Sequence, residues 1–93
     1  MQVPFQSQGW FMFTKSKCSF CTKAKAMLPE AKTVNCDTYI AKNRAGFLQH
    51  VDSVSGQRPR TFPMIFFDGR FMGGYTSTKR YVDNMQDFHF ENF

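Results

Sequence analysis

Short apolar runs alternate along the chain with segments whose apolar residues recur at helical spacing. Residues 10–14 form a continuous run, Trp-Phe-Met-Phe-Thr, between a glycine and a polar Lys-Ser-Lys sequence. Such a run predicts a buried central strand. Between Cys21 and Leu28 the apolar residues then recur at helical spacing until Pro29 ends the pattern. This predicts a short helix, with Cys18 just ahead of it or in its first turn.

The middle of the chain predicts a strand and a longer helix. Residues 32–37 form the strand, on a weak signal. Apolar residues between Ile40 and Val54 fall at helical spacing, and Gly56 can cap that helix at its C-terminus. Gly46 lies inside the pattern, where glycine costs about 1 kcal/mol relative to alanine. The first turns of this helix are therefore the least certain part of its extent.

A hairpin gives the strongest local signal. Met64-Ile-Phe-Phe67 and Arg70-Phe-Met72 are two apolar runs joined by Asp68-Gly69. Asp-Gly supplies the positive φ values that a two-residue type I′ turn needs, so the two runs are predicted to pair as antiparallel strands.

A third helix is predicted after this hairpin. Gly73-Gly74 ends the second strand, Thr76 or Ser77 can serve as N-cap, and apolar residues recur from Tyr81 to Phe88. The order is β, α, β, α, β, β, α, in which the first βαβ unit should be parallel and right-handed. A four-stranded mixed β-sheet with three helices on its two faces is an α/β, thioredoxin-like fold. The 93 residues fit one domain, residues 1–93.

Composition and charge narrow the possible functions. The chain is 42% hydrophobic and has 12 Phe, which predicts an aromatic core. It has no apolar stretch of membrane-spanning length and no signal-peptide pattern at its start, so we expect a soluble, cytoplasmic monomer without a membrane partner. The net charge of +5 favours anionic partners. Without a basic run or a recognised binding motif, we expect no nucleic-acid partner.

The candidate chemistry lies in the sequence Cys18-Ser-Phe-Cys21, at a strand-to-helix junction. A helix N-terminus carries positive partial charge and stabilises a thiolate at the first cysteine, and Lys15 and Lys17 add to this effect. The second cysteine lies almost one turn deeper, close enough for a disulfide and more shielded from solvent. This predicts a redox-active pair with Cys18 as nucleophile and Cys21 as resolving thiol.

A metal site is the alternative interpretation of the same cysteines. Cys18, Cys21, Cys36 and His50 have spacing compatible with a Cys3His zinc site. Against this, Cys36 and His50 would have to converge on Cys18 across elements whose own patterns separate them. We expect Cys36 to be a small buried residue at a strand end and His50 to be solvated, and we expect no metal.

Three motifs together resemble the glutaredoxin family. Residues 13–21, Phe-Thr-Lys-Ser-Lys-Cys-Ser-Phe-Cys, are similar to its strand, basic residue and Cys-Pro-Tyr-Cys motif. Thr61-Phe62-Pro63 is similar to its Thr-Val-Pro segment, and Gly73-Gly-Tyr-Thr-Ser77 to its Gly-Gly-Tyr-Thr-Asp segment. The resemblance implies a glutathione-dependent thiol-disulfide oxidoreductase. Its reducing co-substrate would be glutathione, and its partners disulfide-containing or glutathionylated proteins.

The resemblance also implies a glutathione site. Pro63 would be cis, and the backbone of Phe62 would pair with the cysteinyl part of glutathione beside Cys18. Lys15, with Arg58 or Arg60, would bind the glycyl carboxylate. Thr76 and Ser77 at a helix N-terminus would hold the γ-glutamyl carboxylate. The implied binding residues are Lys15, Phe20, Arg58, Arg60, Thr61, Phe62, Pro63, Gly74, Tyr75, Thr76 and Ser77.

Three residues depart from the family pattern. Ser19 replaces a frequent proline, Phe20 a tyrosine, and Ser77 an aspartate. Some family members with serine in the motif hold an iron-sulfur cluster between two subunits through the first cysteine and glutathione. The alternative to the oxidoreductase is therefore an iron-sulfur or zinc binding module that uses the same cysteines. A further alternative is a redox adaptor that takes electrons from a thioredoxin-type reductase.

Overall fold

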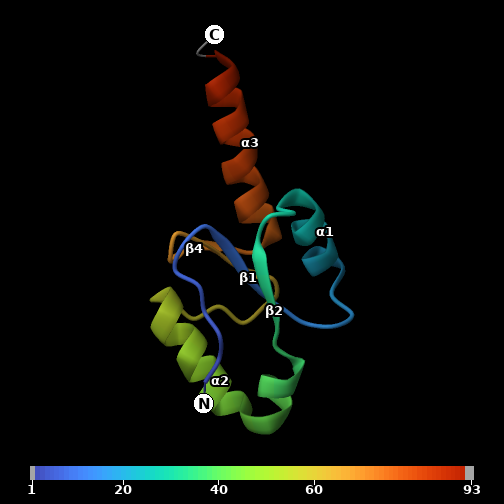
Figure 1. The fold of residues 1–93 in the computed structure, drawn as a ribbon, viewed down its shortest axis with the longest axis vertical. Coiled ribbons are helices and arrows are strands. Elements are labelled where there is room, and N and C mark those ends of the chain that lie inside the picture. The colour runs from blue at the N-terminus through green and yellow to red at the C-terminus, as the bar shows by residue number, and fades with distance from the viewer. Residues whose placement is uncertain (1, 92–93) are drawn as a thin grey trace.

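The structure, a computed structural model, describes residues 2–91 and the side chains of residues 2–85. Its helices and strands follow the predicted order and form one four-stranded sheet in the order β2-β1-β3-β4 (Figure 1). Strand β1 is parallel to β2 and antiparallel to β3, and β3 pairs antiparallel with β4. The predicted thioredoxin-like fold is confirmed. The elements are β1 (Trp10–Thr14), α1 (Ser19–Met27), β2 (Lys32–Asn35), α2 (Asp37–Ser55), β3 (Met64–Phe67), β4 (Arg70–Gly73) and α3 (Tyr75–Glu91).

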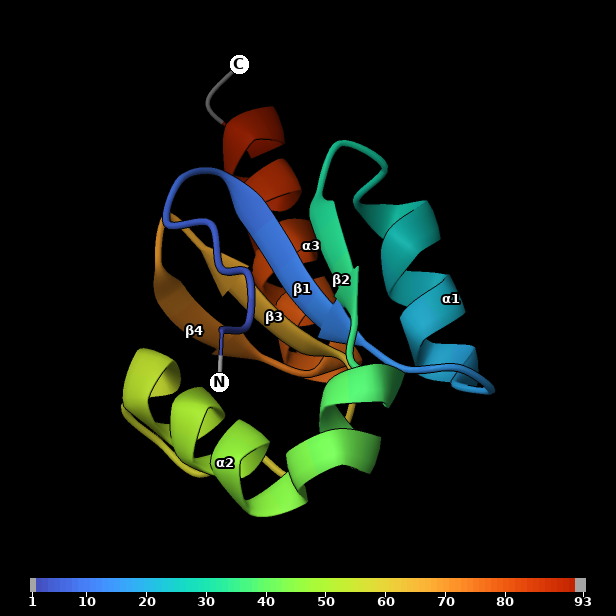
Figure 2. The ribbon, with the colours of Figure 1, turned by 60° about the horizontal axis from the view of Figure 1, so that its bottom comes forward.

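Helices cover both faces of the sheet (Figure 2). Successive side chains of a strand point to opposite faces, so the continuous apolar runs of β1 and β3 place apolar side chains on both. On β1, Phe11 and Phe13 point toward α2, whereas Met12 points toward α1 and α3. On β3 the same alternation separates Met64 and Phe66 from Ile65. The α2 side is an aromatic core in which the rings of Phe11 and Phe13 meet edge to face, 5.0 Å apart. This confirms the predicted aromatic core.

The N-terminal segment before β1 completes this core, although its sequence predicts no element. Val3 is buried, and the ring of Phe5 lies edge to face 5.1 Å from Phe11 and 5.0 Å from Phe66. Asp68 in the hairpin turn anchors the segment's end, since its carboxylate accepts a 2.7 Å hydrogen bond from the Gly9 N–H. The segment is therefore part of the folded domain.

The two predicted glycine turns have the expected backbone. Asp68 and Gly69 have φ values of 49° and 81°, as a type I′ hairpin turn requires. Gly56 has a φ of 69° and caps the C-terminus of α2.

Helix α2 is kinked in its first turns, the part whose extent was least certain from the sequence. Asn43 has φ −159° and ψ 81°, which interrupts the helix, and its side-chain oxygen accepts a 2.9 Å hydrogen bond from the Gly46 N–H. Asn43 thus acts as the N-cap of the second part of α2. A Cβ at Gly46 would collide with the Asn43 side-chain amide, so glycine makes room for this cap.

Two predicted boundaries are wrong. The strand predicted at 32–37 ends at Asn35, whose side-chain oxygen accepts a 2.9 Å hydrogen bond from the Asp37 N–H and turns the chain into α2. Helix α3 begins at Tyr75, so Thr76 and Ser77 lie in its first turn and neither is its N-cap.

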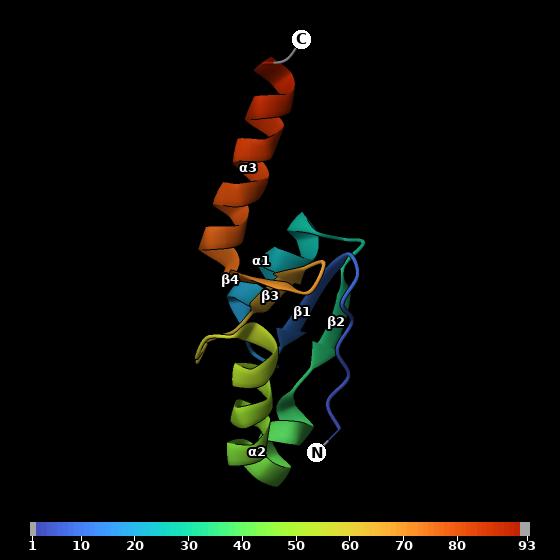
Figure 3. The ribbon, with the colours of Figure 1, turned by 90° about the vertical axis from the view of Figure 1, so that its left-hand side faces the viewer.

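Helix α3 runs well beyond the sheet (Figure 3). Val82 packs on the core beneath it, whereas Tyr81 and Met85 are 37% and 52% exposed. The side chain of Phe88, the last residue of the predicted stripe, lies outside the described residues. Within residues 2–91, none of the helices has the length and apolar character needed to cross a membrane.

Candidate functional site

The two cysteines lie at the junction between β1 and α1. Cys18 is the N-cap of α1 and forms a disulfide with Cys21, their Cα atoms 5.2 Å apart. The Cys21 N–H donates a 3.2 Å hydrogen bond to Cys18 Sγ. Cys21 is 1% exposed, whereas Cys18 is partly exposed. Cys18 is therefore the more accessible of the two sulfurs.

The electrostatic surroundings of Cys18 favour a thiolate. In the reduced protein, Cys18 Sγ would lie at the amide end of α1, whose first turn has no acidic residue. Lys15 and Lys17, both exposed, add positive charge in the loop just before it.

A cis peptide bond lies beside the cysteines. The Phe62–Pro63 bond is cis, as the family resemblance implied, and the carbonyl oxygen of Phe62 lies 3.7 Å from Cys18 Sγ. The chain segment before β3 is thus in contact with the reactive sulfur. Residues 44 positions apart meet because β3 runs antiparallel to β1, so the loop that precedes β3 adjoins the loop that follows β1.

A cavity of about 370 Å³ opens between this segment and the start of α3; we call it the α3 cavity. Phe20 on one side is 49% exposed, and its ring centre lies 5.8 Å from that of Tyr75. The structure brings together eight of the predicted binding residues here: Phe20, Thr61, Phe62, Pro63, Gly74, Tyr75, Thr76 and Ser77.

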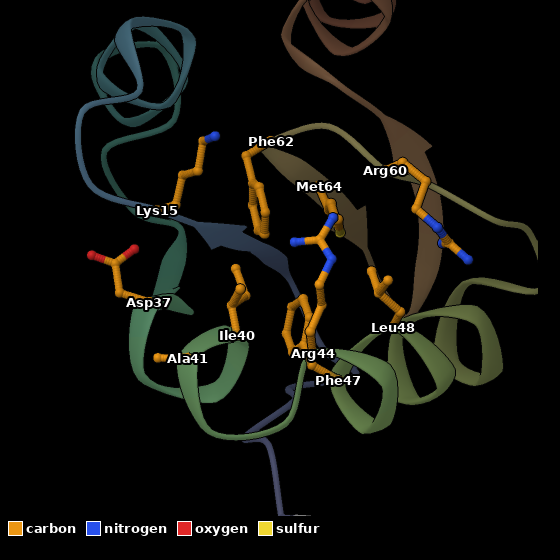
Figure 4. A pocket seen from close by; sticks show the side chains of 10 residues that line it. All are labelled: Lys15, Asp37, Ile40, Ala41, Arg44, Phe47, Leu48, Arg60, Phe62 and Met64. Atoms are coloured by element: carbon orange, nitrogen blue, oxygen red, sulfur yellow. The ribbon is translucent and has the colours of Figure 1, made fainter.

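A second cavity of about 350 Å³, which we call the α2 cavity, lies on the other side of Phe62 (Figure 4). Two more of the predicted residues, Lys15 and Arg60, line this cavity. Phe62 lines both cavities, so its side chain lies between these two cationic residues and the predicted residues at the start of α3. Lys15 Nζ lies 5.9 Å from the centre of the Phe62 ring. The remaining lining residues are Asp37, Ile40, Ala41, Arg44, Phe47, Leu48 and Met64.

Of the residues predicted to bind glutathione, the two arginines, Arg58 and Arg60, lie least favourably for that role. Arg58 lines neither cavity. Arg60 reaches the α2 cavity, but its guanidinium forms a two-point salt bridge with Asp52, at 2.8 and 3.0 Å. That hydrogen-bonded guanidinium lowers the pKa of the Asp52 carboxyl. The residue that sequence reasoning missed is Arg44, which α2 brings to the cavity without any motif around it to signal a site.

Asp37 connects the start of α2 to the loop that carries the cysteine motif. Its carboxylate accepts a 3.0 Å hydrogen bond from the Ser16 N–H, and Asn35 donates a 3.4 Å bond to the Ser16 hydroxyl. The hydrogen bonds from Ser16, with the nearby Lys15 charge as a smaller cause, lower the pKa of Asp37. The loop between β1 and Cys18 is thereby held against α2.

The zinc ligand set suggested by spacing is not assembled. Cys36 is a free, fully buried thiol in the core on the α2 side, as expected for a small residue at a strand end, and burial raises its pKa to about 12. Cys18 and Cys21 are on α1, over the opposite face. The part of the chain that the structure describes contains no group of three or more metal-ligating side chains. The expectation for His50 is wrong, because its Nε2 is buried without a hydrogen-bond partner among the described residues.

Comparisons of the sequence with a family model and with known proteins all find glutaredoxins. The model of the family described as Glutaredoxin matches residues 11–72. The mitochondrial glutaredoxin-2 of Homo sapiens is 36% identical over 73 residues, which are 74% of this chain and 42% of that protein. The Bos taurus protein of the same name is 34% identical over 74% of this chain and 44% of its own length. The chain thus spans less than half the length of these relatives.

Solved structures show the same fold. Glutaredoxin 1 from Francisella tularensis, complexed with cacodylate, has a TM-score of 0.69 at 24% identity, over 85% of this chain and 96% of that one. A buckwheat glutaredoxin–glutathione complex has a TM-score of 0.60 at 22% identity, over 84% of this chain and 72% of that one. Oxidized glutaredoxin 2 from Chlamydomonas reinhardtii has a TM-score of 0.61 at 26% identity, over 84% and 74%.

Proposed function

The chain belongs to the glutaredoxin family, and from this premise we propose that it is a glutathione-dependent thiol-disulfide oxidoreductase that reduces protein disulfides and glutathione mixed disulfides. One observation carries the proposal. The Cys18–Cys21 disulfide lies at the N-terminus of α1, in contact with the cis Phe62–Pro63 segment.

The proposed reduction of a protein disulfide proceeds in two exchanges. The Cys18 thiolate attacks one sulfur of the substrate, the substrate S–S bond breaks, and the departing thiolate takes up a proton. Cys21 then loses its proton and attacks Cys18 Sγ, which releases the second substrate thiolate. The product is the Cys18–Cys21 disulfide present in the structure. The two electrons gained by the substrate come from these two thiols.

Two molecules of glutathione regenerate the dithiol. The first attacks Cys18 and forms a mixed disulfide, which frees Cys21 as a thiol. The second attacks the glutathione sulfur of that mixed disulfide, releases glutathione disulfide and leaves Cys18 as a thiolate. A thiolate stabilised by the helix N-terminus is a good leaving group, so this last exchange is fast.

We place glutathione along the Phe62–Pro63 segment, with its γ-glutamyl end in the α3 cavity and its glycyl end at the α2 cavity. Its γ-glutamyl carboxylate would receive hydrogen bonds from the first turn of α3 and the hydroxyls of Thr76 and Ser77. Its cysteinyl part would lie along the backbone of Phe62 next to Cys18, and its glycyl carboxylate would face Lys15. The buckwheat glutaredoxin solved in complex with glutathione supports this proposal through its shared fold.

We also propose that the protein works as a monomer in the cytoplasm. The unpaired thiol of Cys36 is compatible with a reducing compartment. The names of the mammalian relatives place those proteins in mitochondria, so a cell-fractionation experiment decides between the two compartments.

Single cysteine variants test the proposed roles. Cys18→Ser should abolish both the reduction of a protein disulfide and the deglutathionylation of a small substrate. Cys21→Ser should keep deglutathionylation, since glutathione itself can release the glutathionyl group from Cys18, and lose most protein-disulfide reduction. Mass spectrometry should find the trapped mixed disulfide at Cys18.

Cys36→Ala is the matched control for these variants, because it removes a thiol that lies in the core away from the site. It should retain both activities. Activity of Cys18→Ser through Cys21, or complete loss in Cys36→Ala with the fold intact, would show that the nucleophile is wrongly assigned.

A further inference from the structure

Hydrogen bonds from the turn between β2 and α2 hold Ser16, two residues before Cys18. The Asp37 carboxylate accepts a 3.0 Å hydrogen bond from the Ser16 N–H, and the Asn35 side-chain amide donates a 3.4 Å hydrogen bond to the Ser16 hydroxyl. The Asn35 side-chain oxygen also accepts a 2.9 Å hydrogen bond from the Asp37 N–H, so the two residues that hold Ser16 are fixed to each other. We call these three residues the Ser16 clamp.

The parallel pairing of β1 and β2 explains the position of the Ser16 clamp. The register pairs Thr14 with Asn35 at the carboxyl ends of the two strands, and the Cys36 N–H donates a 2.8 Å hydrogen bond to the Thr14 carbonyl oxygen. The loop that follows β1 and the turn that follows β2 therefore begin side by side. In Figure 4 the Asp37 side chain points toward the loop that carries Lys15.

Lys17, between Ser16 and Cys18, has a φ of 54°, in the left-handed region that residues other than glycine rarely adopt. Such a conformation costs free energy and persists where the surrounding structure holds it. The Ser16 clamp holds the chain on one side of Lys17. On the other side Cys18 is fixed to α1, because its carbonyl oxygen accepts a 3.2 Å hydrogen bond from the Thr22 N–H and its Sγ accepts one of 3.2 Å from the Cys21 N–H.

The direction from which the chain enters α1 decides where the reactive sulfur lies. As the N-cap of α1, Cys18 has a φ of −125° and a ψ of 100°, and in this extended conformation its Sγ accepts the hydrogen bond from the Cys21 N–H. The stabilisation of an anion by a helix N-terminus falls off within the first turn. A Cys18 residue released from this conformation would therefore lose part of the stabilisation of its thiolate.

From these contacts we propose that Asp37, supported by Asn35, is a positioning residue for the Cys18 thiolate. Its carboxylate fixes Ser16, the fixed loop holds Lys17 in its left-handed conformation, and Cys18 Sγ stays at the amide end of α1. This inference rests on the proposed function, in which Cys18 is the attacking and leaving thiolate. It adds to that function a residue of α2 that acts on the reaction through Cys18.

The charge of Asp37 and its hydrogen bond to Ser16 act on Cys18 in opposite directions. A carboxylate near Cys18 disfavours a second anion there, so the charge alone would make the thiolate less stable. The hydrogen bond makes the thiolate more stable, because it keeps the sulfur at the helix N-terminus. The ionisable side chains on the segments around Cys18 are Lys15 and Lys17 in the loop, Cys21 and Lys23 on α1, Asp37 on α2, Arg60 before β3 and Tyr75 on α3.

The rate of alkylation by iodoacetamide, measured across pH on the reduced full chain, tests the proposal because it follows the thiolate fraction. Cys21 and Cys36 are buried, and peptide mass spectrometry verifies that Cys18 is the residue modified. Asp37→Ala removes both the charge and the hydrogen-bond acceptor. It should raise the pH of half-maximal rate by about 0.5 unit, since an interaction with a helix terminus corresponds to roughly 0.2–0.7 unit. Asn35→Ala should raise it by a smaller amount.

Asp37→Asn separates the hydrogen bond from the charge. Its amide oxygen can still accept the Ser16 N–H, so the pH of half-maximal rate should stay within about 0.2 unit of the wild-type value. Glu30→Ala is the matched control, because it removes an exposed carboxylate that lines neither cavity. It should leave the pH of half-maximal rate unchanged.

The sign of the shift in Asp37→Ala decides the proposal. A shift to lower pH, as the charge alone would produce, or a value equal to that of Glu30→Ala would overturn the positioning role. Asn35→Ala gives the same decision where Asp37→Ala is too unstable to purify, because an unchanged or lower value in Asn35→Ala would also overturn it. The alkylation needs no substrate, so absence of deglutathionylation by the wild-type protein would overturn the proposed function and not the positioning role.

Discussion

At the scale of single residues, Lys15 has the most direct bearing on the proposed glutathione site, because it lies next to Phe62 at the border of the two cavities. If its ammonium group pairs with the glycyl carboxylate, Lys15→Ala should raise KM for a small glutathionylated substrate. The expected increase is up to about fivefold, since exposed ion pairs contribute about 0.2–1 kcal/mol. Steady-state kinetics at low and high salt measure this effect.

Lys25→Ala is the control for Lys15→Ala, because Lys25 is an exposed lysine of α1 that lines neither cavity. It should leave KM close to the wild-type value. An unchanged KM for Lys15→Ala at both salt concentrations would contradict the contact with the carboxylate.

Asp37 provides a pH-dependent test at the same scale. The hydrogen bonds from Ser16 lower the pKa of Asp37 in the folded protein, so the unfolded state takes up its proton first as the pH falls. The stabilisation is therefore complete above the unfolded pKa of about 3.9 and is lost as the pH falls through the lower folded value. Asp37→Asn should lower the urea midpoint at pH 7, and this difference should shrink below about pH 4.

Glu30→Gln serves as the comparison for Asp37→Asn, since Glu30 is an exposed carboxylate outside both cavities. Its urea midpoint should follow the wild type at both pH values. A difference between Asp37→Asn and wild type that stays constant down to pH 2 would show that the charge of Asp37 does not stabilise the loop.

At the scale of elements, the kink in α2 reverses the usual effect of replacing a helical glycine. In a regular helix Gly→Ala stabilises by about 1 kcal/mol. Here a Cβ at residue 46 would displace the Asn43 side chain, whose hydrogen bond to the Gly46 N–H caps the second part of the helix. Loss of this cap costs about 0.5–2 kcal/mol and is set against the helix gain of about 1 kcal/mol, so Gly46→Ala should lack the usual stabilisation and should destabilise the protein by up to about 1 kcal/mol. Urea unfolding measures the difference.

The double variant Asn43→Ala/Gly46→Ala shows whether the collision is the cause. Once the Asn43 side chain is absent, the added methyl group has space. Gly46→Ala should then be neutral or stabilising when it is made in the Asn43→Ala background. A single Gly46→Ala variant that is more stable than wild type would contradict the steric argument.

At the scale of the whole molecule, the N-terminal segment contributes to stability because it closes the aromatic core. Phe5 lies between Phe11 and Phe66, with ring centres 5.1 and 5.0 Å away. Phe5→Ala should lower the free energy of unfolding by about 2–3 kcal/mol, somewhat less than for a fully buried phenylalanine. Thermal or urea unfolding of the full chain checks this value.

The exposed neighbour Gln6 supplies the control, since Gln6→Ala changes the same segment without removing a ring from the core. This variant should remain within about 0.5 kcal/mol of wild type. A Phe5→Ala protein as stable as Gln6→Ala would mean that the segment does not pack on the core in solution.

The order of helices, strands and turns along the chain could be predicted because each of these features depends on residues that are close together in the sequence. The type I′ turn at Asp68-Gly69, the C-cap at Gly56 and the position of Cys18 ahead of α1 each depend on a few adjacent residues. The family resemblance added the cis Pro63 and most of the residues around the α3 cavity. The sequence by itself therefore determined the order of elements, the fold class and the reactive cysteine pair.

The tertiary structure alone determined which side chains that are distant in the sequence contact each other. Arg60 is occupied by Asp52 because α2 and the loop before β3 lie side by side, and the same placement brings Arg44 to the α2 cavity. Phe5 joins the core because the chain before β1 folds back onto the same face of the sheet as α2. No local pattern encodes these choices, since an arginine or phenylalanine has the same neighbours in the chain whichever partner it meets in space.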